Sequence, residues 1–362
     1  MSAPGDALDL LPDAPLLDVA GLAKRFIGRQ TLARRLGGKP APAVNALNGV
    51  SFTMRRGETL GIVGESGCGK STLARCLVRL VEPDAGAVRF DGEDVLSLSG
   101  SERRRFNRRV QMIFQDPYGS LNPRMTVRQI LVEALTVHRM RPAAQIPARV
   151  TELLDLVRLP EDAADRLPHE FSGGQRQRIG IARALAVEPE CLIADELVSA
   201  LDVSVQAQVV NLLLELQERL HLTVLFVAHD LRLVRHISHR VAVMYLGSIV
   251  ELGETERLFT APKHPYTQAL LAAAPEMDPT RRNRTPAARG ELPSPFDLPS
   301  GCPFHPRCPH VFERCRVEAP ALTLHPGGDL AACHLADPVP LPAHEAVPEG
   351  YAIIAGEPQV PA

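Results

Sequence analysis

The sequence predicts an α/β fold: a parallel sheet with a block of helices inserted into it and a small cysteine-rich segment after it. Strand-like apolar runs alternate with helical stretches from Asp18 to about Val250, which is typical of an α/β domain. Between Pro117 and Leu185 the strand-like runs stop and the sequence becomes mostly helical. A glycine-rich loop directly follows one strand-like run, which indicates a phosphate site at the end of the sheet.

Short apolar runs of the buried parallel kind indicate most of the strands. The expected strands are Ala46–Met54, Thr59–Val63, Ala87–Phe90, Val110–Phe114, Cys191–Ala194, Thr223–Ala228, Arg240–Tyr245 and Ser248–Leu252. Leu246-Gly247, between the last two, predicts a hairpin turn. A helix is expected to pack on the sheet through one apolar face. That face consists of Val205, Val209, Leu212, Leu213, Leu216 and Leu220.

Length and charge limit the possible function. The 362 residues suffice for one large core and a smaller appendage, and the net charge of −2 gives no signature for nucleic acid or an anionic membrane. No apolar run approaches the roughly 18–20 residues of a membrane-spanning helix. Residues 1–16 are acidic and proline-rich, unlike a signal peptide. We therefore expect a cytoplasmic chain that reaches a membrane only through partners.

The strongest local pattern is the P-loop Gly64-Glu65-Ser66-Gly67-Cys68-Gly69-Lys70-Ser71. It follows the expected strand at 59–63 and precedes a helical stretch, Thr72–Leu80, which is the context that the motif needs. Backbone amides of such a loop form an anion nest at the positive end of the helix. Lys70 adds charge near the β- and γ-phosphates, and the Ser71 hydroxyl is placed to bind Mg²⁺. A glycine-rich turn without a ligand is the alternative.

Two carboxylates end another expected strand. Asp195 and Glu196 follow an apolar run, so they should face the same crevice as the P-loop. Asp195 suits a contact to Mg²⁺, and Glu196 can orient and polarise the attacking water. The alternative is an acidic pair that merely terminates a strand.

A second glycine-containing run identifies the kind of P-loop protein. The run is Phe171-Ser172-Gly173-Gly174-Gln175-Arg176-Gln177-Arg178. It resembles the signature of ATP-binding-cassette (ABC) proteins, which usually begins with Leu where this chain has Phe171. Ser172 and the amides of Gly173 and Gly174, followed by Gln175, form an anion-binding element ahead of a helix expected at 176–185. The resemblance implies that two cassettes stack head to tail, so that each signature closes on the ATP of the other.

Further motifs of that family follow in the expected order. The resemblance implies that Gln115 is the Q-loop glutamine, which senses Mg²⁺, that Asp202 belongs to the D-loop at the dimer seam, and that His229 contacts the γ-phosphate. Phe26 is the candidate for stacking on adenine, with a place in the core as the alternative. One departure is Leu197, where the family usually has Pro, a residue that restricts the backbone of the preceding glutamate. We expect activity to survive, with a changed rate.

Two stretches resemble the ATPase subunits of bacterial oligopeptide/dipeptide importers. These are Asp116–Arg124 and His264–Leu271, and the resemblance covers about residues 17 to 335. It implies a second, different ATPase subunit, two membrane permease subunits and an extracytoplasmic solute-binding protein, with this chain peripheral on the cytoplasmic side of the inner membrane. Relatives in the same group carry nickel, so nickel or another small solute is the alternative cargo.

The resemblance divides the chain into four parts. Residues 1–16 form a disordered N-terminus, 17–258 the ABC ATPase domain with a helical subdomain at about 117–185, 259–336 a C-terminal extension, and 337–362 a tail. The expected fold is a RecA-like P-loop core with an antiparallel β subdomain.

The extension contains a cysteine quartet, Cys302, Cys308, Cys315 and Cys333, separated by five, six and seventeen residues. The quartet resembles those that hold a [4Fe–4S] cluster in this subfamily. Four thiolates also satisfy tetrahedral zinc, although the spacing is looser than the usual zinc pairs. Free thiols in a proline-rich loop are the remaining alternative, and His305 and His334 are the less favoured ligands.

Two other functions compete. Cassette ATPases that act on nucleic acid usually carry two cassettes or a long coiled coil, but this chain has one P-loop and no room for such an insertion between Gly69 and Ser172. The basic run at 103–109 fits a solvated or membrane-proximal face better than a nucleic-acid patch. A metal-sensing regulator on an inactive cassette conflicts with intact Lys70, Asp195 and Glu196.

Overall fold

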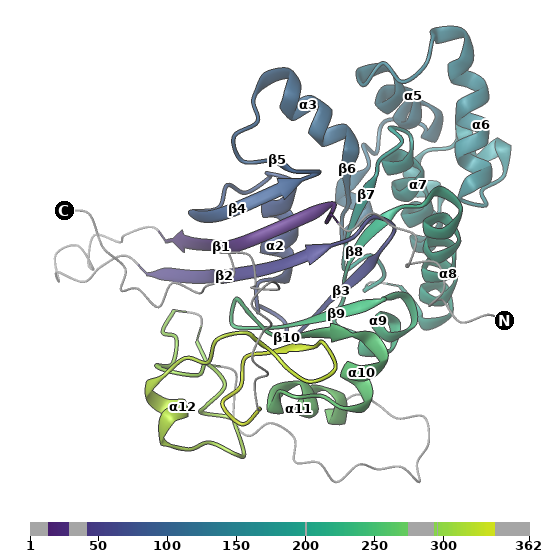
Figure 1. Cartoon of the computed structure of the whole chain (residues 1–362). Helices are drawn as coiled ribbons and strands as arrows, with labels where there is room; N and C mark the ends of the chain where they lie inside the picture. The colour runs from purple at the N-terminus through teal and green to yellow at the C-terminus, as the bar shows by residue number, and fades with distance from the viewer. Residues whose placement is uncertain (1–13, 29–41, 200, 274–292, 295, 337–362) are drawn as a thin grey trace, which may run out of the picture.

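An eight-stranded sheet forms the centre of the protein (Figure 1). The computed structural model describes residues 14–28, 42–199, 201–273, 293–294 and 296–336. The strand order is β11-β12-β10-β9-β3-β8-β7-β6. Its parallel part consists of β6 (Val110–Ile113), β7 (Cys191–Asp195), β8 (Thr223–Val227), β3 (Thr59–Val63) and β9 (Arg240–Tyr245). Every residue of β3, β7 and β8 is buried, as expected for parallel strands covered on both faces.

The antiparallel end of this sheet begins with the hairpin of β9 and β10 (Ser248–Glu254). Leu246 and Gly247 both have positive φ, 44° and 82°, as a type I′ turn requires, so the predicted hairpin is confirmed. Two short strands, β12 (Leu330–Ala331) and β11 (Thr323–Leu324), extend the sheet beyond β10. The sequence did not indicate this extension, because two-residue strands carry no periodicity.

A second, antiparallel sheet has the order β2-β1-β4-β5. Its strands are β1 (Leu17–Ile27), β2 (Ala43–Met54), β4 (Ala85–Phe90) and β5 (Glu93–Asp94). One buried cluster joins Phe52 of this sheet, Leu60 of β3 and Leu73 of the helix α2 (Lys70–Leu77). The helix therefore shares a hydrophobic core with both sheets, which fixes its position at the end of β3.

Helices occupy the region between β6 and β7. They are α4 (Pro117–Ser120), α5 (Val127–Val137), α6 (Ile146–Leu156) and α7 (Gly173–Leu185), with 3₁₀ turns at Ala143–Gln145, Glu161–Asp165 and Pro168–Glu170. A capping box at Thr126 begins α5: the Thr126 hydroxyl accepts from the Gln129 backbone amide, and the side-chain oxygen of Gln129 accepts from the Thr126 backbone amide. Buried Ile130, Leu131 and Leu135 fix α5 on this block.

Three further helices and a short C-terminal group complete the fold. α3 (Gly100–Arg109) precedes β6, α8 (Val203–Leu220) follows β7, and α9 (Leu231–Ile237) follows β8. The predicted apolar face of α8 is buried at Val209, Leu212, Leu213 and Leu216, whereas Leu220 at its end is 39% exposed. After β10 come α10 (Thr255–Thr260), α11 (Pro265–Ala273) and α12 (Glu313–Val317). No helix in the described ranges combines the length and the apolar character that crossing a membrane requires.

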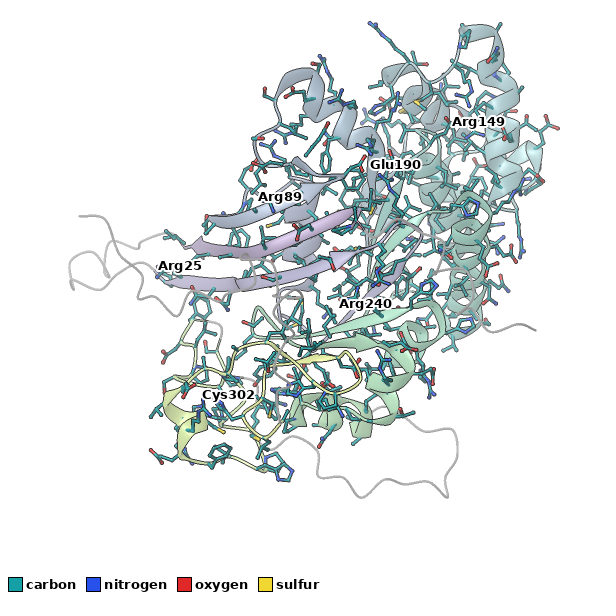
Figure 2. All side chains as sticks on the ribbon, in the orientation of Figure 1. Arg25, Arg89, Arg149, Glu190, Arg240 and Cys302 are labelled. Carbon is teal, nitrogen blue, oxygen red and sulfur yellow. The ribbon has the colours of Figure 1, made fainter. Side chains whose placement is uncertain are left out.

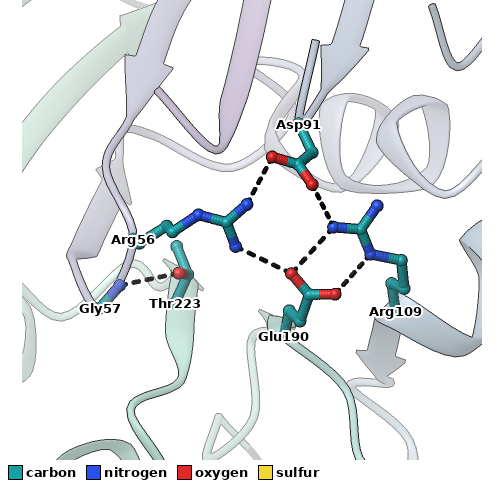
Figure 3. Close-up of polar contacts among 6 residues, drawn as sticks. All are labelled: Arg56, Gly57, Asp91, Arg109, Glu190 and Thr223. Atoms are coloured by element: carbon teal, nitrogen blue, oxygen red, sulfur yellow. Dashed lines mark hydrogen bonds and ion pairs between the residues drawn. The ribbon is translucent and has the colours of Figure 1, made fainter. Parts of the chain in front are cut away.

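Four charged residues join the two sheets (Figure 3). The carboxylate of Glu190, just before β7, accepts from Arg56 at 2.9 Å and from Arg109 at the end of α3. Asp91, just after β4, accepts from the same two guanidinium groups. The pKa values of both carboxyl groups lie below their ordinary values, chiefly because Arg109 donates hydrogen bonds to them. The network therefore holds together segments that are far apart in the sequence, at residues 56, 91, 109 and 190.

Two expectations lie wholly or partly outside the described residues. They are the tail at 337–362 and the disordered N-terminus at 1–16, of which residues 1–13 are not described. Leu16 is described and buried, and its amide donates to the Met54 carbonyl at 2.8 Å, so the expected disorder is wrong at this residue.

Candidate functional site

The P-loop connects the end of β3 to the start of α2, as the motif predicts. Gly64 has φ of 154°, and a Cβ atom there would lie 2.2 Å from the Met244 carbonyl oxygen; at Gly69, with φ of 107°, it would lie 2.3 Å from the Ala46 carbonyl oxygen. Glycine is therefore required at both positions. The amide of Gly247, in the β9–β10 turn, donates to the Cys68 carbonyl at 2.9 Å, so the hairpin supports the loop from outside.

Lys70 lies buried inside its own loop, with only 4% of its surface exposed. Its Nζ atom donates to the carbonyl oxygens of Gly64 at 2.9 Å and of Glu65 at 3.1 Å. The ammonium group is thus held in the concave face of the loop. Ser66 and Gly67 are exposed at the mouth of the loop. The Cys68 side chain is buried, and its burial raises the pKa of the thiol, so it packs rather than reacts.

Ser71 and Asp195 meet at the C-terminal edge of the sheet. The Ser71 hydroxyl, in the first turn of α2 beside Thr72, donates to Oδ1 of Asp195 at 2.8 Å. Asp195 ends β7 and is 1% exposed, and this burial raises the pKa of its carboxyl. Two oxygen ligands side by side, one of them a carboxylate, form the donor set that Mg²⁺ prefers.

Glu196 and Gln115 form a second pair beside the first. Nε2 of Gln115, which follows β6, donates to Oε2 of Glu196 at 2.7 Å. Glu196 has a left-handed backbone with φ of 47°, and its amide donates to the Val227 carbonyl at 2.9 Å. Leu197 is 2% exposed, so its burial anchors the turn in which the family usually has proline. The expected effect of Leu197 on the rate stays a prediction.

The signature run forms the N-terminus of α7. Ser172 is the N-cap: its hydroxyl accepts from the Gln175 amide at 3.4 Å, and the Gln175 side-chain oxygen accepts from the Ser172 amide at 3.0 Å. The helix begins at Gly173, three residues earlier than expected, because this capping box places both glycines in the first turn. Ser172 and Gln175 are exposed, whereas Gly174 is buried against Val205 of α8.

Three other predicted site residues lie on the surface. His229 is exposed just after β8, and Asp202 is exposed as the residue before α8. Phe26, near the end of β1, is 41% exposed, and Nζ of Lys24 lies 5.5 Å from the centre of its ring. The alternative of a core position for Phe26 is therefore wrong.

The four C-terminal cysteines line one small cavity, in the segment where Figure 2 labels Cys302. His305 and His334 also line it. Within the described ranges, no three histidine, cysteine or carboxylate side chains are arranged around a single ion-sized point. Burial raises the pKa of Cys302 to about 11, so this thiol is protonated near neutral pH without a metal.

Two residues that the motifs did not single out reach the P-loop from the C-terminal part of the chain. The Tyr266 hydroxyl accepts from the Glu65 amide at 3.0 Å, and the Arg307 guanidinium pairs with the Glu65 carboxylate. Arg307 lies 242 residues from Glu65 in the sequence, and only the folded structure could reveal this contact.

Comparisons with known proteins agree with this geometry. Residues 47–199 match the family described as ABC transporter, and residues 250–315 match the one described as oligopeptide/dipeptide transporter, C-terminal region. The probable peptide ABC transporter ATP-binding protein y4tS of Sinorhizobium fredii is 54% identical over 82% of this chain and 84% of its own length. The oligopeptide transport ATP-binding protein AppF of Bacillus subtilis is 50% identical over 88% of this chain and 97% of its own.

Solved structures confirm the expected cassette fold. The dimeric, post-hydrolysis ATP-binding cassette MJ0796, bound to ADP and Pi, is 27% identical to this chain with a TM-score of 0.57, and the match covers 66% of this chain and 98% of that one. Fold, P-loop and signature thus agree with both family matches. The chain belongs to the ABC transporter family, in the group of ATP-binding proteins that carry the oligopeptide/dipeptide transporter C-terminal region.

Proposed function

We propose that this chain is the ATP-hydrolysing subunit of an importer of di- and oligopeptides, peripheral on the cytoplasmic face of the inner membrane. The observation that carries the proposal is the pair of hydrogen bonds beside the P-loop, Ser71 to Asp195 and Gln115 to Glu196. These bonds lie at one edge of the sheet, where the first pair would hold Mg²⁺ and the second would act on water. The peptide cargo is inferred from relatives that are named as peptide or oligopeptide transport proteins.

The P-loop would bind the triphosphate through the amides of residues 64–71 and through Lys70. The lysine now donates to the carbonyl oxygens of Gly64 and Glu65, and phosphate oxygens would compete for the same ammonium group. Ser71 and Asp195 would hold Mg²⁺, which supplies charge neutralisation to the phosphates. Phe26, on the exposed end of β1, would stack on adenine.

Glu196 would act on the attacking water. Its carboxylate accepts a proton from the water while the water oxygen bonds to the γ-phosphorus and the bond to the ADP oxygen breaks. Gln115 now occupies one oxygen of this carboxylate, at 2.7 Å. Movement of Gln115 would therefore free Glu196 for water, and this ties the chemistry to the helices that follow Gln115. His229, exposed after β8, would contact the γ-phosphate.

The signature supports a head-to-tail dimer with a second cassette subunit. Ser172 and Gln175 are exposed at the N-terminus of α7, where the helix dipole favours an anion. An ATP presented by the P-loop of the second subunit would meet this end. Asp202 is exposed as well, as a residue at the dimer seam would be in a single chain.

A groove suits contact with a membrane permease subunit. It has a volume of about 440 Å³ and lies between the core and the inserted helices, lined by Met112 and Phe114 on one side and by Ile130 and Val137 of α5 on the other. Val137 is 69% exposed. Because Phe114 directly precedes Gln115, a segment seated here would be coupled to the ATP site.

The cysteine quartet would hold a [4Fe–4S] cluster. The proposal rests on the resemblance of the quartet to cluster-binding quartets and on one observation, that all four cysteines line the same cavity. Among the described residues, their present arrangement does not by itself form an ion site. The cavity itself is small, about 10 Å³, so binding would spread the four side chains. The surrounding segment is built mostly of turns, and a metal would hold its ends together.

Anaerobic purification tests this site. We expect about four iron and four sulfide ions per chain, together with broad visible absorbance. The Cys302→Ser and Cys308→Ser variants should lose this absorbance, whereas the control Cys76→Ser, in α2, should keep it. One zinc per chain without iron would replace the cluster with a zinc site, and absence of both metals would leave the quartet as free thiols.

The variant Glu196→Gln tests the hydrolytic role. It keeps the shape of the side chain but cannot accept the proton, so we expect ATP binding to persist while turnover falls by roughly 10²-fold or more. The measurement is phosphate release by the assembled transporter, together with the fraction of ATP-bound dimer. Glu218→Gln, on the exposed side of α8, is the matched control and should hydrolyse at the parent rate. Near-normal turnover of Glu196→Gln would remove the base assignment.

A further inference from the structure

The C-terminal segment makes a charged contact with the P-loop. The Arg307 guanidinium forms two parallel hydrogen bonds with the Glu65 carboxylate, 2.8 Å from Nη1 to Oε2 and 3.0 Å from Nη2 to Oε1. Its side chain is 9% exposed, and that of Glu65 is 29% exposed. A two-pronged, largely desolvated pair fixes direction as well as distance, unlike a flexible surface ion pair.

Glu65 is held at three points, and each contact reaches a different part of the residue. Its side chain binds Arg307, its amide donates to the Tyr266 hydroxyl at 3.0 Å, and its carbonyl accepts from Lys70 at 3.1 Å. Glu65 is the second residue of the P-loop. The orientation of its peptide groups therefore sets the shape of the turn that the lysine and the following amides line.

An aromatic cluster contains Tyr266 and packs against Arg307, the two residues of the C-terminal part that contact Glu65. Tyr266, Tyr245 and Phe304 are fully buried, with ring centres 4.6 Å apart for the two tyrosines and 5.4 Å from each tyrosine to Phe304. The Arg307 guanidinium lies 5.9 Å from the centre of the Tyr245 ring and 6.0 Å from that of Phe304. These rings leave Arg307 little freedom to release Glu65.

The same cluster borders the cysteine cavity. Phe304 and His264 line that cavity, and their ring centres are 5.7 Å apart. Arg307 and Phe304 both lie in the loop between Cys302 and Cys308. The loop that presents the first two cysteines is thus the loop that holds the P-loop.

We propose that Arg307 and Tyr266 are positioning residues of the phosphate site, through which the C-terminal segment braces the P-loop in the shape that binds ATP. The inference rests on the proposed function, since it assumes that this P-loop binds ATP. The brace acts on ground-state binding of the triphosphate. Its loss raises KM and Kd for MgATP and leaves kcat nearly unchanged, because Arg307 and Tyr266 touch neither the water nor Glu196.

The test compares MgATP affinity of the full-length chain, and KM and kcat of the assembled transporter, across a set of variants. Arg307→Met keeps much of the side-chain bulk and removes the charge, Glu65→Gln weakens the other partner, and Tyr266→Phe removes only the hydroxyl. We expect Arg307→Met to raise Kd and KM about tenfold, as for a hydrogen-bonded charged pair, with kcat within about twofold. Arg314→Ala, in the exposed Arg314–Glu318 pair of the same segment, is the control and should keep the parent values.

A double-mutant cycle separates a brace from general loss of packing. If the pair acts as one unit, Glu65→Gln combined with Arg307→Met should cost little more than either change alone. Additive effects, or a lowered melting temperature with unchanged KM, would overturn the proposal. If Arg307→Met does not fold, Tyr266→Phe and Glu65→Gln decide the matter by the same KM criterion.

Lys70→Ala separates a failure of the ATP site from a failure of the brace formed by Arg307 and Tyr266. Loss of ATP binding in Lys70→Ala with parent affinity in the brace variants would reject the brace alone. Parent affinity and turnover in Lys70→Ala would reject the ATP site itself, and the brace with it.

Discussion

Glu196 shows how a strained backbone can be held without the residue that usually restrains it. A left-handed conformation costs a non-glycine residue roughly 1–2 kcal/mol. Here the amide of Glu196 bonds to Val227, its carboxylate accepts from Gln115, and the next side chain, Leu197, is buried in the core. We therefore expect Leu197 to leave the carboxylate in place, so that the unusual sequence alters the rate at most.

Phe26 gives a prediction at the same scale. Its exposure predicts that Phe26→Ala leaves stability within about 0.5 kcal/mol of the parent. If the ring stacks on adenine, the same change should weaken MgATP binding by roughly tenfold, from a loss of about 1–3 kcal/mol, while Phe26→Trp should retain affinity. Fluorescence titration with ATP measures the affinity of both variants, and urea unfolding measures the stability of Phe26→Ala. Ile27→Ala, at an even more exposed neighbour, is the control. Unchanged affinity in Phe26→Ala would assign adenine binding to another residue.

Secondary-structure elements divide into those that the sequence could predict and those that it could not. β3 and β9 begin and end where their apolar runs predict, because strands buried on both faces need continuous apolar sequence. α7 starts before its expected residue, because a serine cap outweighs the low helix propensity of two glycines. β11 and β12 are too short to leave a pattern and form only because β10 offers an edge.

The site divides in the same way. Ser71, Asp195, Gln115 and Glu196 meet as their motifs predict, since each follows or precedes a predictable parallel strand. The contact between Arg307 and Glu65 depends on how a proline-rich segment folds back over the core. No local pattern of residue types encodes such a contact, so sequence reasoning missed it.

The charged network of Figure 3 yields a pH-dependent prediction at the scale of elements. The pKa of Glu190 is lowered by hydrogen bonds from Arg109, so the folded state favours its ionised form. This stabilisation is present above the ordinary carboxyl pKa and is lost as the pH falls through the lowered value. Glu190→Gln should therefore reduce the free energy of unfolding by roughly 1 kcal/mol at pH 7, a figure that allows for solvent screening of this partly exposed group.

Urea unfolding at several pH values measures this effect. The difference between parent and Glu190→Gln should shrink as the pH drops below about 4. Glu82→Gln, which removes the exposed carboxylate of the pair with Arg79, should change stability by less than about 0.5 kcal/mol. A Glu190→Gln deficit that stays constant down to pH 3 would mean that packing, and not charge, accounts for it.

At the scale of the whole molecule, the P-loop is supported from three directions. β3 and α2 carry it, the β9–β10 turn bonds to Cys68, and the C-terminal segment holds Glu65. The 440 Å³ groove lies between the core and the inserted helices, beside Gln115. Under the proposed function, this arrangement would give a membrane partner access to the Gln115–Glu196 pair while the phosphate loop itself stays fixed.

ATP-dependent uptake of a labelled dipeptide or oligopeptide into vesicles that contain the assembled transporter tests the central claim most directly. We predict uptake that requires MgATP and is accompanied by peptide-stimulated phosphate release, with both strongly reduced when this chain carries Glu196→Gln. Peptide uptake that is undiminished by Glu196→Gln, or vesicles that take up nickel but no peptide, would contradict the account.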